Sequence, residues 1–122
     1  MTRTFTKAFL AGGIVVLSAW GAFSHPVLKS TLPQADASLQ TPKEIRLTFS
    51  EALILRFSGV KLKDQDGRRV ETGPVALDPK DQKQLVVPLK SLLAPGRYTV
   101  EWHAVSEDTH RLKGSYSFEV KP

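Results

Sequence analysis

The sequence predicts an all-β domain of about seven short strands, folded as an antiparallel β-sandwich or a small Greek-key barrel. Apolar and polar residues alternate in short runs, as in strands that bury one face, and glycine and proline turn signals separate these runs. No helical periodicity lasts three turns. With 122 residues, 41% apolar and 24% charged, the chain has the size and composition of one globular domain.

The first segment, residues 1–24, has the three regions of a secretory signal peptide. Two early positive charges precede the apolar stretch Ala8–Trp20, and small residues occupy the −3 and −1 positions of a cleavage site after Ser24. A competing site follows Gly21. An uncleaved anchor is a further alternative, although the apolar stretch is shorter than the roughly 20 residues of a membrane span. The favoured cleavage makes His25 the first residue of the mature protein.

The mature domain is expected to span residues 25–122, with strands taken in order along the chain. Asp66-Gly67 and Pro95-Gly96 are the clearest turn signals between them, and Glu51–Phe57 is the nearest candidate for a single helical turn. The predicted strands are Leu28–Leu32, Lys43–Ser50, Gly59–Lys63, short runs at Val70 and at Val75 to Leu77, Leu85–Leu89, Tyr98–Val105 and Tyr116–Val120.

The last two predicted strands flank a polar connection, Ser106–His110. Their core faces carry Tyr98, Val100, Trp102 and Ala104 and then Tyr116, Phe118 and Val120. In an extended segment residues i and i+2 point the same way, so Asp108 and His110 are expected to converge at one end of a sheet. A converging carboxylate and imidazole resemble half of a metal site.

Charge and composition exclude several other classes. The formal charge is +5, but without residues 1–24 the chain has 15 basic and 12 acidic residues. These are interleaved, so there is no basic stripe of the kind that binds nucleic acid. Cysteine is absent and Met1 is the only methionine, so metal ligands must be His, Asp or Glu side chains or a chain terminus.

A histidine at a free N-terminus can chelate a metal through its α-amino group and its ring Nδ1. Pro26 follows His25 and has no amide N–H to deprotonate, so the terminus should supply two nitrogens only. Together with Asp108 and His110 the donor set is three nitrogens and one oxygen. This set suits tetragonal Cu(II), while zinc could occupy it tetrahedrally.

Simpler interpretations exist for each residue. Asp108 and His110 could be a surface loop pair explained by turn chemistry, and His25 merely a residue near a cleavage site. His103 lies on the polar face of its strand and is expected to be a solvated bystander. Glu51 could be an ordinary polar strand end. The hypothesis that His25, Asp108 and His110 bind one metal ion together is favoured because the chain has no other region rich in ligand side chains.

The chain resembles the CopC family of periplasmic copper-binding proteins, including its YobA-like members. The resemblance covers nearly all of the mature chain. The matching residues are His25, Leu28-Lys29-Ser30, Pro33-x-Ala35-Asp36, Leu47-Thr48-Phe49-Ser50-Glu51, Phe57-Ser58-Gly59-Val60, Pro95-Gly96-x-Tyr98-x-Val100-x-Trp102, Val105-Ser106-x-Asp108-x-His110 and Gly114-Ser115-Tyr116-Ser117-Phe118.

This resemblance implies an Ig-like Greek-key fold, cupredoxin-like in overall shape, that binds one Cu(II) per chain through His25, Asp108 and His110. It also implies that Glu51 lies beside the metal as a weak ligand or as outer-shell support. Two features depart from the family pattern. Val27 stands where members often have a second histidine, and the methionine-rich Cu(I) loop of some members is missing.

The expected function is therefore periplasmic or secreted Cu(II) binding in copper homeostasis or resistance, by a soluble and monomeric protein that is not an enzyme. The family suggests a CopD-type membrane copper transporter as the partner. Two alternatives belong to other classes. One is a copper monooxygenase with a histidine brace, and the other is a metal-free β-sandwich interaction module.

Overall fold

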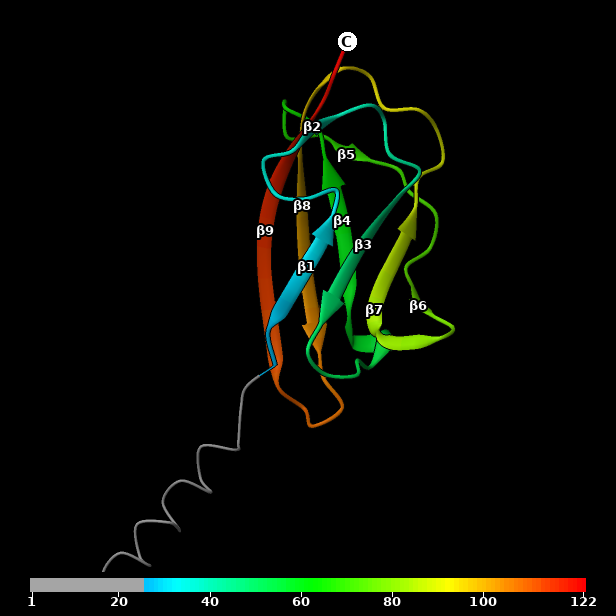
Figure 1. Cartoon of the computed structure of the whole chain (residues 1–122), viewed down its shortest axis with the longest axis vertical. Coiled ribbons are helices and arrows are strands. Elements are labelled where there is room, and N and C mark those ends of the chain that lie inside the picture. Colours follow the sequence, from blue (N-terminus) through cyan, green and yellow to red (C-terminus); the bar gives the residue numbers. More distant parts are fainter. Residues whose placement is uncertain (1–25) are drawn as a thin grey trace, which may run out of the picture.

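The computed structural model describes residues 26–122, which form two β-sheets packed face to face (Figure 1). The four-stranded sheet contains, in spatial order, β1 (Leu28–Leu32), β3 (Glu44–Phe49), β7 (Asp81–Pro88) and β6 (Ala76–Asp78). The five-stranded sheet contains β2 (Ser38–Leu39), β9 (Arg111–Val120), β8 (Gly96–Val105), β4 (Gly59–Lys63) and β5 (Arg69–Val70).

The all-β prediction is confirmed, and of its two forms the sandwich is the one observed. Within residues 26–122 the strands remain in two separate sheets and do not close into a barrel. The limits of β1 and β4 are those predicted. The expected helical turn is present as a short 3₁₀ helix, η2 (Leu55–Phe57). The same part of the chain has nine strands rather than about seven: the short runs predicted at Val70 and at Val75 to Leu77 form β5 and β6, and β2 was not predicted.

The core lies between the sheets and follows the alternation in the sequence. In β3 every second residue is fully buried, namely Ile45, Leu47 and Phe49, while the residues between them face outward. Phe118 of β9 is also fully buried. Trp102 is only partly buried, and its ring meets Phe49 edge to face with centroids 5.3 Å apart. Aromatic and aliphatic packing therefore joins the two sheets.

The longest pairing in the molecule joins β8 to β9. It runs in antiparallel register from Gly96 opposite Val120 to Val105 opposite Arg111. The connection between these strands emerges at the lower end of Figure 1, where the described chain also begins, and the C-terminus lies at the opposite end. None of the helical turns in residues 26–122 is long and apolar enough to cross a membrane.

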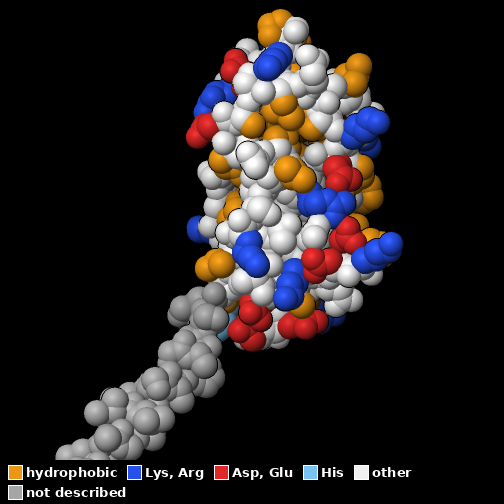
Figure 2. All heavy atoms as spheres, viewed as in Figure 1, with side chains coloured by type: hydrophobic (Ala, Val, Ile, Leu, Met, Phe, Trp, Pro, Cys, Tyr) orange, Lys and Arg blue, Asp and Glu red, His pale blue; other side chains and the backbone are white. Residues whose placement is uncertain are grey.

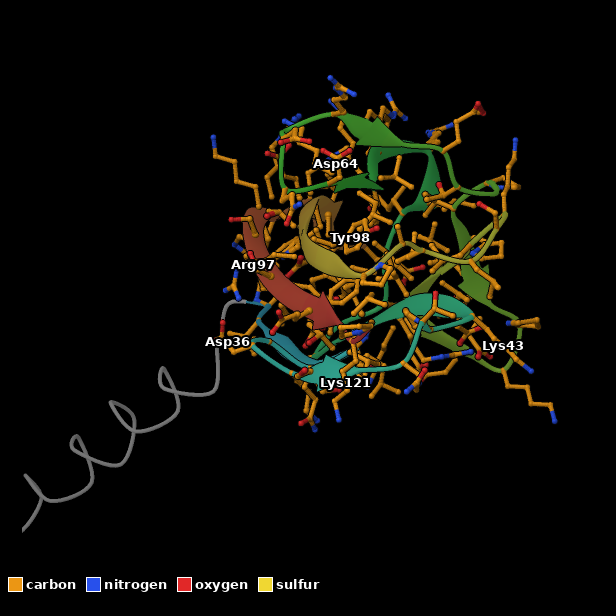
Figure 3. All side chains as sticks on the ribbon, turned by 90° about the horizontal axis from the view of Figure 1, so that it is seen from above. Asp36, Lys43, Asp64, Arg97, Tyr98 and Lys121 are labelled. Carbon is orange, nitrogen blue, oxygen red and sulfur yellow. The ribbon has the colours of Figure 1, made fainter. Side chains whose placement is uncertain are left out.

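Ion pairs on the surface link segments that are far apart in the sequence. Arg46 of β3 contacts Asp78 of β6 at 2.6 Å and Glu44 of its own strand at 2.9 Å. This guanidinium holds the pKa of the Asp78 carboxyl below its usual range. At the upper end of the molecule Arg97 meets Asp36 at 3.1 Å, and Figure 3 shows these two side by side. The second pair links β8 to the segment before β2.

Two tyrosines of the five-stranded sheet differ in how their hydroxyl groups are satisfied. The phenol of Tyr98 donates a hydrogen bond to the carbonyl of Ala94 at 2.7 Å. The phenol oxygen of Tyr116 is buried without a hydrogen-bond partner among the described residues. Burial raises the pKa of Tyr116 to about 12, an effect that the nearby Thr31 side chain partly offsets. Removing the hydroxyl of Tyr98 should therefore lower the free energy of unfolding, whereas removing that of Tyr116 should not.

We expect Tyr116→Phe to leave the free energy of unfolding unchanged or to raise it by about 1 kcal/mol, because a buried orphan hydroxyl is removed. Tyr98→Phe, the matched control, should lower it by about 1 kcal/mol. An unfolded tyrosine ionises near pH 10, so the raised folded pKa makes the wild type lose stability as the pH rises from about 10 towards 12. Urea unfolding at pH 7 measures the effects of the two substitutions, and urea unfolding above pH 10 measures the loss of stability of the wild type. Equal destabilisation by Tyr116→Phe and Tyr98→Phe would contradict the expected difference.

Candidate metal centre

The β8–β9 connection brings Asp108 and His110 together at one end of the sandwich. The Nδ1 atom of His110 lies 2.9 Å from Oδ2 of Asp108, and both side chains are about half exposed, at 47% and 49%. The predicted convergence of this carboxylate and this imidazole is thus observed. They are accessible from solvent, as a site that takes up an ion must be.

The route to this convergence differs from the prediction. The connection is a tight turn and not an extended segment: the amide of Ser106 donates to the carbonyl of His110 at 2.9 Å, and the amide of Thr109 donates to the carbonyl of Ser106 at 2.8 Å. Thr109 has a φ of 71°, an unusual conformation for a β-branched residue. Alternation along a strand therefore does not explain why the two side chains meet. The turn does.

The side chain of Ser106 holds the carboxylate of Asp108 in place. It is the fully buried polar residue of the described chain, and its hydroxyl donates a short hydrogen bond to Oδ1 of Asp108. This hydrogen bond, followed by the contact with His110, lowers the pKa of Asp108 below its ordinary value. The carboxylate is thereby fixed in position and kept anionic, with Oδ2 directed at the imidazole.

The separation of the two donors fits a tetragonal metal ion. Two donor atoms bound at about 2.0 Å and at a right angle to one another stand about 2.8 Å apart. The observed 2.9 Å between Nδ1 and Oδ2 is close to this value. The same distance is that of an ordinary hydrogen bond between the ring N–H and the carboxylate, so the imidazole must turn a deprotonated nitrogen towards an ion before both groups can bind it.

The first described residues are fixed at the same end. Pro26 is fully buried, the amide of Val27 donates to the hydroxyl of Ser50 at 2.9 Å, and the amide of Ser50 donates to the carbonyl of Val27 at 2.9 Å. The loop after Ser50 is in turn bonded to the β8–β9 connection, because the amide of Glu107 donates to the carbonyl of Ala52 at 2.9 Å. Three separate stretches of chain thus meet here.

The other predicted site residues are placed less directly. His25 lies outside the described residues. Glu51 is half-buried in the loop that contacts the β8–β9 connection, but residues 26–122 contain no group of three or more His, Asp or Glu side chains arranged to hold a metal ion. Its role beside a metal stays a prediction. His103 is exposed on the outer face of β8, where its ring lies over Gly59.

Two supporting residues were not predicted, Ser106 and Ser50. Both lie within matched motifs, yet their tasks depend on partners that only the folded chain brings close. A serine two positions before an aspartate is a signal for a short side-chain hydrogen bond, and it could have indicated Ser106. The partner of Ser50 is 23 residues away, so no local pattern indicates that contact.

The charge around the site favours cations. Figure 2 shows acidic side chains gathered at the lower end of the molecule, whereas elsewhere in this view positive and negative side chains are interspersed. Glu51, Glu107 and Asp108 belong to the loops at this end. A local negative field raises the concentration of a divalent cation near the donors.

Comparison with known proteins gives one family and several close relatives. The model of the CopC domain matches residues 28–121. "Copper resistance protein C" of Escherichia coli is 41% identical over 121 residues, which cover 94% of this chain and 96% of that protein. "Protein YobA" of Escherichia coli K12 is also 41% identical, over 118 residues that cover 96% and 93% of the two chains.

A solved structure agrees with these sequence matches. The crystal structure of PcoC, described as a methionine-rich copper resistance protein from Escherichia coli, superposes with a TM-score of 0.73. The two chains are 42% identical, and the match covers 80% of this chain and all of that one. Fold and sequence therefore point to the same group of proteins.

The Ser106 hydrogen bond can be tested without metal. Ser106→Ala should raise the pKa of the Asp108 carboxyl towards the ordinary value of about 3.9, as measured by NMR titration. Because the folded pKa is the lower one, this interaction stabilises the fold at neutral pH and is lost as the pH falls below about 4. Ser115→Ala, at an exposed serine of β9, is the matched control and should leave the pKa of Asp108 unchanged. An unaltered Asp108 titration in Ser106→Ala would contradict the proposed support.

Proposed function

This chain belongs to the CopC family, and from that membership we propose that it is a periplasmic Cu(II)-binding protein of copper homeostasis and resistance, binding one ion per chain. The observation that carries the proposal is the Asp108–His110 pair, in which a carboxylate oxygen and an imidazole nitrogen of the kinds that bind Cu(II) lie together at one solvent-exposed end of the sandwich. Copper is the cargo of the site. The protein holds the ion for buffering or delivery and catalyses no reaction on it.

His25 completes the proposed donor set. Residues 1–24 are removed as a signal peptide, and the exposed amine and the imidazole of His25 then chelate the ion. The burial of Pro26 at the site end supports this proposal, because it fixes the first described residue near Asp108 and His110. The hydrogen bonds between Val27 and Ser50 hold this short lead in place.

Asp108 supplies an anionic oxygen and His110 a nitrogen, while Glu51 acts as a weak ligand or orients an imidazole. The similar protein PcoC is described as methionine rich, whereas Met1 is the only methionine of this sequence. Thioether sulfur is the soft donor that selects Cu(I). The site proposed here is therefore specific to the oxidised ion, and a CopD-type membrane transporter is the proposed recipient.

Processing is the first test. We expect the protein that begins at His25 to bind one equivalent of Cu(II) with nitrogen-rich coordination in electron paramagnetic resonance. One glycine added ahead of His25 turns the chelating amine into an amide, so affinity should fall at least about tenfold, or about 1.4 kcal/mol. Equal affinity of the two forms would remove the terminus from the site.

Substitution separates ligands from bystanders. Asp108→Ala and His110→Ala should each weaken Cu(II) binding by more than about 100-fold, and Glu51→Gln by about 10-fold, as expected for an outer-shell group. His103→Ala is the control histidine and should bind like the wild type. Competition titration with a chelator of known affinity gives the four values. The ligand assignment is wrong if His103→Ala proves as harmful as His110→Ala.

A further inference from the structure

Two adjoining hollows lie on the outer face of the five-stranded sheet, and neither is lined by Asp108 or His110. One has a volume of about 360 Å³ and lies between Phe57 of η2 and Arg111–Lys113 of β9, with His103–Val105 of β8 as its floor. The other, of about 480 Å³, continues along β8 between Lys61 and Ser115. Because His103 and Lys113 line both hollows, they form one channel, here named the β8 groove.

The β8 groove is positively charged although the sequence shows no basic stripe. Folding places Lys61 of β4 on one side of β8, and Lys113 and Arg111 of β9 on the other side and further along the groove. Glu101 is the one acidic residue lining the groove among the described residues, and its carboxylate is paired with Lys63 at 3.1 Å. With three cationic side chains and one carboxylate in its lining, the groove carries an excess of positive charge.

One end of the groove is also apolar. Phe57 is 50% exposed and its neighbour Leu55 is 38% exposed, in a small domain that otherwise buries most of its large side chains. The guanidinium of Arg56 lies over the Phe57 ring, 4.9 Å from its centroid. This end could take an apolar side chain while the cations around it bind carboxylates.

The shape of the groove matches an extended peptide. Its floor follows β8 from Glu101 to Val105 and is about 13 Å long at about 3.3 Å per residue. A polyanion such as a nucleic acid fits less well, because the groove opens beside the acidic loop that contains Glu107 and Asp108. Its continuous phosphate charge would meet these carboxylates, whereas a short acidic segment can end before them.

We propose that the β8 groove is a docking site for an extended, acidic segment of a partner protein that carries at least one apolar side chain. Its carboxylates pair with Lys61, Lys113 and Arg111, and the apolar side chain packs on Phe57. Since Arg111 directly follows His110, a segment bound here ends beside the metal donors. That the docked partner exchanges copper rests on the function proposed above; the docking itself does not.

The test titrates ¹⁵N-labelled protein beginning at His25 with a capped peptide in which glutamate alternates with leucine. Amide shifts should be confined to the residues that line the groove, Phe57, Lys61, Glu101–Val105 and Arg111–Ser115, and binding should weaken with added salt. Lys61→Glu combined with Lys113→Glu should raise the Kd at least about tenfold, and Phe57→Ser should raise it as well. Lys83→Glu, at an exposed lysine of the other sheet, is the matched control and should bind like the wild type.

Several results would overturn the proposal. These are the absence of binding, shifts spread over both sheets, equal weakening by Lys83→Glu, equal binding of a peptide with glutamine in place of glutamate, or tighter binding of oligothymidylate. Dispersed amide spectra confirm that each variant is folded. Cu(II) titration of the groove variants should match the wild type, so a failure of the copper site and a failure of the docking site are read separately.

Discussion

The pairing of β8 with β9 is the constraint on which the candidate site depends. Their register sets the length of the connection between Val105 and Arg111, and in a strand pair a slip of one residue would turn every side chain to the opposite face. With the register fixed, Ser106 is buried at the base of the turn and its hydroxyl positions Asp108. The candidate metal donors are thus positioned by a scaffold that is built on the apolar core.

Most of the fold follows from patterns that are local in the sequence. Alternation gave β1, β3, β4 and β8 nearly to the residue, because one face of each packs on the core. The strand β2 was missed, since its two residues pair in parallel with the end of β9 through backbone groups and show no alternation. The first half of β9 was also missed: Arg111 and Lys113 there face the outer groove, and polar residues at those positions resemble a loop.

Part of the candidate site was also predictable, because it depends on residues that are close together in the sequence. Asp108 and His110 are near neighbours in sequence, so their convergence needed only a local geometry, even though a turn and not an extended strand provides it. The contacts of Ser50 and Ala52 join segments that are far apart along the chain, and only the packed sandwich brings them together. The positive charge of the β8 groove is hidden in the sequence for the same reason, because its lysines and arginine come from different strands.

The ends of the described chain lie at opposite poles of the sandwich, with Pro26 beside the donors and Pro122 at the far end (Figure 1). This separation makes the two termini unequal as points of attachment. A tether, dye or surface linked through the C-terminal pole would leave the pole with Asp108 and His110 facing solution, about the length of a ten-residue strand away. The molecule is thus suited to oriented immobilisation, with the candidate metal centre directed away from the support.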